Sequence, residues 1–156
     1  MNYRVRLAAE SDVDELMKLY HFLSPRYRDD RGAVIGAVVD GRTVVNVVEC
    51  LDEDSKPLVP SQLLGTATVT WRYVPTRGRV AYVDDVVVDP AGRGLGLGKI
   101  LMYACEQTAR VQHCCAIELT SHASRQAANA LYLRLGYRER VTNCYVLDLA
   151  ADSPRP

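Results

Sequence analysis

One stretch of the sequence, residues 80–99, combines the signals of a strand, a glycine-rich turn and a helix. Val86, Val87 and Val88 form a β-branched run that favours a strand. Asp89-Pro90 ends this strand, because proline has no amide hydrogen and restricts the residue before it. Beyond the turn, apolar or small side chains recur with helical spacing at Leu97, Leu101, Ala104, Thr108 and Val111.

The turn itself, Arg93-Gly94-Leu95-Gly96-Leu97-Gly98, is suited to holding a diphosphate. Alternate glycines expose backbone N–H groups and carry no side chain that would keep a ligand away. At a helix N-terminus these amides and the helix dipole favour phosphate, and Arg93 adds a positive charge. The dinucleotide-binding motif G-x-G-x-x-G does not fit, since Lys99 stands at its last glycine. The P-loop of nucleoside-triphosphate-binding proteins does not fit either, since Ile100 stands where it needs Ser or Thr. A glycine-rich turn that only joins a strand to a helix is the alternative.

The remaining sequence predicts one domain, residues 1–150, followed by a loose tail, residues 151–156. Ser11 and Asp14 resemble a capping box at the start of a first helix, which should end near Ser24-Pro25. A second helix is expected within residues 26–40 and a last one over residues 121–135, ended by Gly136. Period-2 or apolar runs predict strands over residues 3–7, 43–50, 63–74, 80–88, 114–120 and 137–149.

Composition narrows the classes of function. The formal net charge is zero, which argues against a nucleic-acid-binding protein, and no apolar run approaches the length of a membrane span. The first residues lack the apolar core of a signal peptide. The five cysteines include no C-x-x-C pair, which favours free thiols over disulfides or a metal site. We therefore expect a cytoplasmic protein without a metal.

Two segments carry a resemblance to a known family. Residues 93–98 match R-x-x-G-x-G after a valine-rich strand, and this resembles the acyl-CoA loop of the GNAT superfamily of N-acyltransferases. Residues 127–137, AANALYLRLGY, are similar to the family segment A-x-x-L-Y-x-x-x-G-F. The element order matches over almost the whole chain. The resemblance implies a three-layer α+β fold: a twisted, mostly antiparallel central sheet with helices on both faces, splayed at the acyl-CoA site.

The resemblance also implies the reaction: an acetyl group moves from acetyl-CoA to a primary amine by direct attack in a ternary complex. Backbone N–H groups of Val86 or Val88 would stabilise the developing oxyanion. Two positions depart from the family pattern, since Arg125 stands where an Asn is frequent and Gly92 where a Tyr is frequent. By resemblance, the acetyl-CoA-binding residues are Val86, Val88, Arg93, Gly94, Leu95, Gly96, Leu97, Gly98, Lys99 and Asn129.

Such a reaction needs a base for the ammonium group, and three carboxylates are candidates. Asp84 occupies the place where many relatives carry a Glu, and its shorter side chain suggests a bridging water. Asp85 would point to the opposite face of a regular strand, although a bulge can change which carboxylate faces the cleft. Glu118, on a neighbouring strand, is the third candidate, and a structural ion pair is the expected role for it.

Tyr132 is the candidate acid for the departing thiolate, because a phenol has a pKa of about 10. The alternative is a tyrosine that only packs on an apolar helix face. Residues 21–30, HFLSPRYRDD, are either a solvated connection or a wall of the acceptor site. His122 is not expected to act as a base.

The acceptor is a small-molecule or peptide amine. Polyamines, amino acids, aminoglycosides and protein N-termini are all candidate acceptors. A homodimer is a candidate oligomeric state. Residues 83–86, VDDV, also resemble glucosamine-6-phosphate acetyltransferases, but residues 127–137 lack the pattern usual in those enzymes, which argues against that acceptor. A function of another class is a non-catalytic acyl-CoA-binding or regulatory domain that kept the glycine loop.

Overall fold

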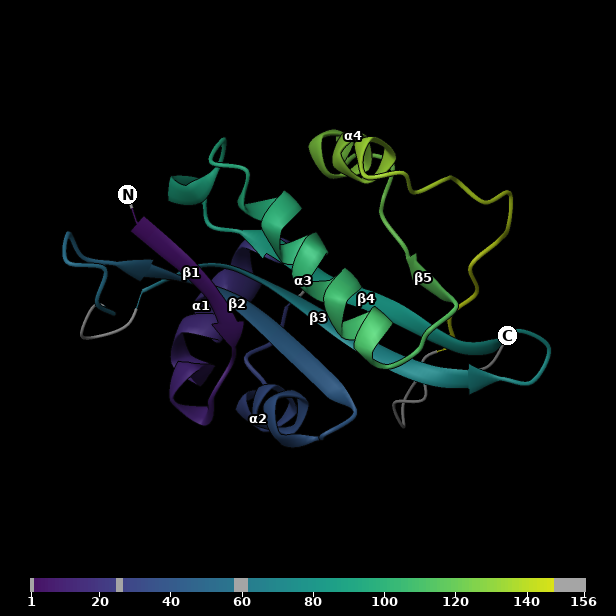
Figure 1. Ribbon diagram of the computed structural model, residues 1–156, viewed down its shortest axis with the longest axis horizontal. Helices are drawn as coiled ribbons and strands as arrows, with labels where there is room; N and C mark the ends of the chain where they lie inside the picture. Colours follow the sequence, from purple (N-terminus) through teal and green to yellow (C-terminus); the bar gives the residue numbers. More distant parts are fainter. Residues whose placement is uncertain (1, 25–26, 58–61, 148–156) are drawn as a thin grey trace.

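The computed structural model describes residues 2–24, 27–57 and 62–147, arranged around one twisted sheet (Figure 1). The sheet has five strands in the order β1-β2-β3-β4-β5. Neighbours are antiparallel from β1 to β4, whereas β4 and β5 are parallel, so the mostly antiparallel sheet is confirmed. The strands are β1 (Asn2–Leu7), β2 (Thr43–Leu51), β3 (Leu63–Val74), β4 (Gly78–Val88) and β5 (Ala116–Leu119).

Helices cover both faces of this sheet (Figure 1). One face carries α1 (Val13–Leu23) and α2 (Arg31–Val39), and the other carries α3 (Leu97–Val111) and α4 (Gln126–Arg134). A separate hydrophobic cluster fills each side, so the three-layer architecture is confirmed. Among the described residues, no helix has the length and apolarity that a bilayer crossing needs.

Strand β3 shows why alternation in sequence does not always mean alternation in exposure. Its bounds are those that the sequence predicts, and the apolar residues Ala67 and Val69 are buried. Thr66 on the other face is equally buried, because helices cover that face as well. Its hydroxyl is satisfied by donating to the carbonyl oxygen of Asn46 at 2.9 Å.

The start of α1 differs from the expected capping box at Ser11 and Asp14. A short 3-10 turn, η1 (Glu10–Asp12), precedes the helix. The carboxylate of Asp12 accepts a hydrogen bond from the backbone N–H of Ala9 at 2.8 Å. Arg6 on β1, six residues earlier, also binds Asp12 and holds it in this position.

Arg6 joins β1, β2 and η1 through two buried carboxylates. It donates to Asp12 at 2.5 and 2.8 Å and to Glu49 on β2 at 2.9 Å. Asp12 and Glu49 are only 1% and 3% exposed. Hydrogen bonding to Arg6 lowers the pKa of both carboxyls, so both are ionised and paired in the folded protein.

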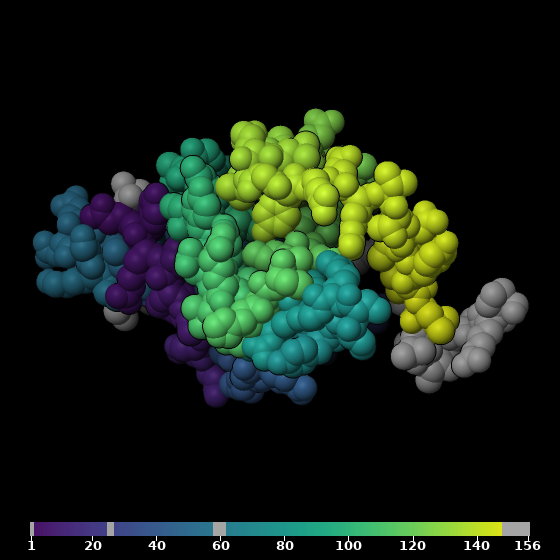
Figure 2. Space-filling view, turned by 45° about the vertical axis from the view of Figure 1, so that its right-hand side comes forward, coloured from purple at the N-terminus to yellow at the C-terminus, as the bar shows by residue number. Residues whose placement is uncertain are grey.

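The strand expected over residues 137–149 is wrong for residues 137–147, and residues 148–149 lie outside the described part. Tyr137 packs beside Tyr132, with ring centroids 5.9 Å apart, and the chain then projects from the body without a ladder partner (Figure 2). Arg140 forms an ion pair with Glu118 at 2.7 Å instead. β propensity near Tyr145 does not suffice, because a strand needs a partner to bond.

Candidate active site

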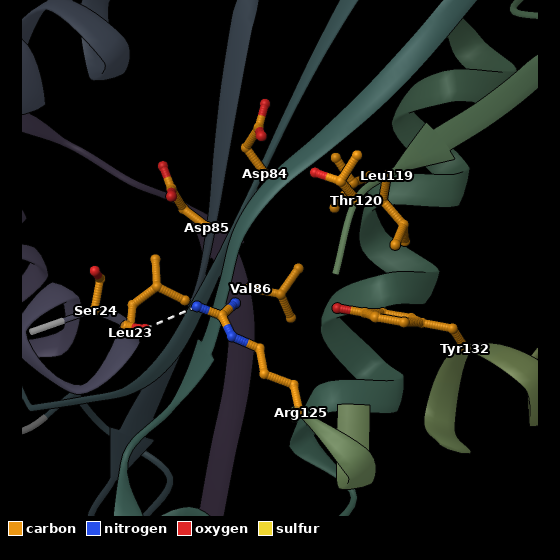
Figure 3. A pocket seen from close by; sticks show the side chains of 10 residues that line it. Leu23, Ser24, Asp84, Asp85, Val86, Leu119, Thr120, Arg125 and Tyr132 are labelled. Carbon is orange, nitrogen blue, oxygen red and sulfur yellow. Dashed lines mark hydrogen bonds between the residues drawn. The ribbon is translucent and has the colours of Figure 1, made fainter. Parts of the chain in front are cut away.

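A cavity of about 250 Å³ opens where β4 and β5 separate. The two strands pair only from Val80–Ala116 to Val83–Leu119, and β4 continues to Val88 beyond this last pair. The splayed sheet that the sequence analysis expects is therefore present. Residues from the end of α1 and from the α4 region also line the cavity (Figure 3). The lining residues are Leu23, Ser24, Val83, Asp84, Asp85, Val86, Leu119, Thr120, Arg125 and Tyr132.

A β-bulge brings both aspartates to this cavity. Asp84 pairs with Thr68 and Val87 pairs with Thr66, so two residues of β4 lie opposite the single residue between those threonines. Asp85, within this bulge, has a left-handed conformation with φ of 51°, which is uncommon for a residue other than glycine. A regular strand would have placed the two carboxylates on opposite faces. The bulge that the sequence analysis considered is observed.

The two aspartates differ in their electrostatic surroundings. Burial raises the pKa of both carboxyl groups above its ordinary value. The charge of Asp85 raises the pKa of Asp84 further, whereas Arg125 opposes the rise at Asp85. No hydrogen bond or ion pair within the described chain engages either carboxylate. A cation therefore acts on Asp85, whereas Asp84 has a neighbouring anion.

Tyr132 approaches the cavity from α4. Its side chain is buried and its hydroxyl points into the cavity, toward Val86 (Figure 3). Burial raises the pKa of the phenol, so that it holds its proton at neutral pH. A protonated phenol in this position can donate a hydrogen bond or a proton to a group in the cavity.

Arg125 is a cavity residue that sequence reasoning registered only as a departure from the family pattern. It lies just before α4, and its Nη2 donates to the backbone oxygen of Leu23 at 2.8 Å (Figure 3). The guanidinium therefore spans the cavity between α4 and the end of α1. Leu23 belongs to the 21–30 segment, so at least part of that segment forms a cavity wall.

Glu118 is not part of the cavity lining. Its carboxylate accepts hydrogen bonds from Arg77 at 2.6 Å and from Arg140 at 2.7 Å. The hydrogen bond from Arg77 is the main reason that its pKa is lowered. The structural ion pair expected from the sequence is confirmed for this residue.

The glycine loop presents free amides at the start of α3. Gly94 and Gly96 have φ of 80° and 76°, which L side chains rarely adopt, and a Cβ at either position would meet open space. In the described part of the chain, no acceptor engages the N–H groups of Gly94, Gly96, Leu97 or Gly98. Exposed Arg93 supplies positive charge beside them. This donor set fits a diphosphate.

Other residues predicted to bind acetyl-CoA have packing contacts of their own. The side chain of Leu97 is buried in the core, and that of Val88 packs against it. A Cβ at Gly98 would lie 3.1 Å from Leu131, so this glycine also permits α3 to approach α4. Asn129 donates to the backbone oxygen of His122 at 3.1 Å and thereby holds the turn that carries Arg125.

A second groove, of about 430 Å³, runs between α3 and α4 directly beyond the glycine loop. These helices lie side by side on the face shown in Figure 2. The groove is lined by Lys99, Tyr103, Leu131, Arg134 and Leu135. Lys99 lies 5.5 Å from the ring centroid of Tyr103. The groove thus combines an aromatic ring with two cationic side chains.

Comparison with known proteins identifies the family. The model of the acetyltransferase (GNAT) family matches residues 6–137. A glucosamine 6-phosphate N-acetyltransferase of Trypanosoma brucei brucei is 34% identical over 143 residues, which cover 88% of this chain and 90% of that one.

Solved structures agree with this match. An acetyltransferase from Trypanosoma brucei has a TM-score of 0.73 at 27% identity and covers 95% of this chain and 100% of its own. Glucosamine-6-phosphate N-acetyltransferase from Arabidopsis thaliana has a TM-score of 0.75 at 18% identity, covers 94% and 99%, and supports the fold alone. The glycine loop, the splayed strands and the family match together show that the chain belongs to the GNAT family of acetyltransferases.

Proposed function

We propose that the protein transfers an acetyl group from acetyl-CoA to a primary amine by direct attack in a ternary complex. The observation that carries this proposal is the cavity at the splay, where Asp84, Asp85 and Tyr132 meet. Two carboxylates with raised pKa and a protonated phenol are the groups that such a transfer needs for its proton movements. A domain that only bound acyl-CoA would have no use for this combination.

In this proposal the amides of Gly94, Gly96 and Gly98 hold the diphosphate of acetyl-CoA, and Arg93 adds its charge. Backbone groups of Val86 and Val88 face the acyl arm, since only a short 3-10 turn, Pro90–Gly92, separates the end of β4 from the loop. The groove beside Lys99 accepts the adenosine end, where Tyr103 offers a ring and Arg134 a second cation. Acetyl-CoA supplies the activated thioester.

Asp84 accepts a proton from the ammonium group of the acceptor, through a water where the distance requires one. The hydroxyl of Tyr27 is buried without a hydrogen-bond partner in the described part, so it can bond to a water. Burial is the main cause that raises the pKa of Tyr27, and Asp85 is one of three carboxylates that raise it further. The neutral amine then forms the C–N bond as the C–S bond breaks. The N–H of Val86 or Val88 stabilises the oxyanion. Tyr132 gives its proton to the departing thiolate, and the second proton that the nitrogen loses restores the phenol.

Turnover assays test whether the protein acetylates a primary amine and which amine it uses. Acetyl-CoA is offered with a panel of primary amines that begins with glucosamine 6-phosphate, the acceptor named for the trypanosomal relative. Release of free CoA and the mass of the N-acetyl product are measured. We expect release that depends on the amine. Binding of acetyl-CoA without release with any amine would show the non-catalytic acyl-CoA-binding domain instead.

Gly96→Asp tests the loop. Aspartate would place a carboxylate beside the diphosphate at a residue whose φ of 76° disfavours any side chain, so we expect the Kd for acetyl-CoA to rise by about 10- to 100-fold. Titration calorimetry measures the change. Gly41→Asp is the matched control, because Gly41 also has a positive φ and open space but follows α2 on the other face. Equal affinity in folded Gly96→Asp and the parent would refute the loop assignment.

Tyr132→Phe tests whether Tyr132 is the general acid for the departing thiolate. The ring and its packing stay, and only the hydroxyl is lost, so we expect kcat to fall by about 10- to 100-fold with little change in KM for acetyl-CoA. Steady-state and single-turnover rates measure the effect on chemistry. Tyr137→Phe is the control, since Tyr137 packs against Tyr132 but does not line the cavity. A Tyr132→Phe enzyme as fast as the parent in the chemical step would leave Tyr132 a packing role only.

A further inference from the structure

Arg125 lines the cavity and, among the described residues, has no carboxylate as a partner. Arg4, Arg6 and Arg77 each form an ion pair with an acidic side chain. Within the described chain Arg125 forms none, and its hydrogen bond goes to the backbone oxygen of Leu23. A guanidinium has five N–H donors, so most of its donors stay available.

The charge of Arg125 acts on the reacting groups from within the cavity. Burial raises the pKa of both Asp85 and Tyr132, and the charge of Arg125 opposes this rise at each of them. Figure 3 shows the guanidinium on the α1 side of the cavity, below the two aspartates. The cavity therefore presents two unpaired carboxylates and one unpaired guanidinium to the same small volume.

This charge pattern is complementary to a molecule with two charges of its own. The aspartates favour an ammonium group, and the guanidinium favours an anion, which it can hold with two parallel hydrogen bonds. We propose that Arg125 binds an anionic group of the acceptor, which makes the acceptor class primary amines that carry a phosphate or a carboxylate. This inference rests on the proposed function, since it names the substrate of the same site.

A purely structural role for Arg125 predicts something different. If the side chain only tied α4 to α1 through Leu23, its removal would affect every acceptor alike. A contact with the substrate affects only acceptors that carry the anion. The discriminating quantity is the ratio of kcat/KM between an anionic amine and its neutral counterpart.

The experiment measures this ratio for three matched pairs: glucosamine 6-phosphate with glucosamine, O-phosphoethanolamine with ethanolamine, and β-alanine with its amide. The first two pairs test phosphate and the third tests carboxylate. For at least one pair we expect the parent protein to favour the anionic member by about 10- to 100-fold, and Arg125→Gln to lose most of that preference. Arg125→Lys should keep part of it, because the charge stays and the planar fork is lost.

Arg110→Gln is the control for the loss of one positive charge, since Arg110 lies on the exposed C-terminal turn of α3 beside Glu106. Its ratios should equal those of the parent. Any effect of Arg125→Gln on the titration of Asp85 applies to both members of a pair and cancels in the ratio. A parent without preference in all three pairs, or a preference unchanged in Arg125→Gln, would overturn the inference.

A binding measurement separates this inference from the proposed function. O-phosphoethanolamine should raise the Tm of the parent and not that of Arg125→Gln, whereas ethanolamine should raise neither. If no amine releases CoA but this difference in Tm is found, the proposed reaction is refuted and the anion site stands. If CoA is released but neither the ratios nor the Tm values depend on Arg125, the reaction stands and the anion site is refuted.

Discussion

Replacing Asp84 by asparagine is expected to lower kcat by about 10²- to 10⁴-fold, the usual contribution of a general base. Asparagine keeps the size of the side chain but cannot accept the proton of the ammonium group. Binding of acetyl-CoA should be retained, because Asp84 lies in the acceptor cavity rather than in the glycine loop. Steady-state kinetics with a saturating amine, together with calorimetry of acetyl-CoA binding, measure both quantities.

The pH dependence of kcat also follows from Asp84. Burial raises the pKa of Asp84, so the base is lost when the pH falls through this raised value, and kcat of the parent should fall with it. The ionised carboxylate of Asp84 is needed for activity, but its burial lowers the stability of the folded protein. A raised pKa in the folded state means that the neutral form is favoured there, so Asp84→Asn should have a Tm at neutral pH equal to or above that of the parent.

Two variants serve as controls for this test. Asp85→Asn removes the neighbouring carboxylate, and Glu118→Gln removes one that is paired outside the cavity. We expect Glu118→Gln to keep kcat within about threefold. Near-parental turnover in Asp84→Asn combined with a large loss in Asp85→Asn would transfer the role of base to Asp85.

Replacing Arg6 by leucine is expected to lower the free energy of unfolding by about 3–5 kcal/mol, the usual cost of breaking a buried ion pair. The variant leaves Asp12 and Glu49, which are 1% and 3% exposed, without their shared cation. Urea denaturation followed by circular dichroism measures the loss. Arg4→Leu is the matched control, since Arg4 also pairs with Glu49 but has a half-exposed side chain, and it should cost about 1 kcal/mol.

Arg6 also makes the protein sensitive to acid. The pKa values of Asp12 and Glu49 are lowered in the folded state, so their contribution to stability is present above their ordinary pKa values. It is lost as the pH falls through the lowered values. Stability of the parent should therefore fall as the pH drops below about 5, and this fall should be much smaller in Arg6→Leu. A variant as stable as the parent at neutral pH would show that the network contributes little.

The sequence by itself determined the elements whose signals are local. The β-branched run, the proline and the alternate glycines lie within residues 80–99, and they produce β4, the loop and α3 as expected. The bounds of β3 and the stop of α1 at Leu23 also follow from neighbouring residues. Asp84 and Tyr132 could be named as candidates because each occupies a recognisable position near such a local motif.

Only the tertiary structure decided what depends on residues far apart in the chain. The left-handed conformation of Asp85 follows from the register of β4 against β3, and it brings two carboxylates to one cavity. Arg125 reaches that cavity because the fold places the start of α4 beside the end of α1. The segment 137–147 has strand propensity but no strand, since pairing requires a partner that no local pattern supplies.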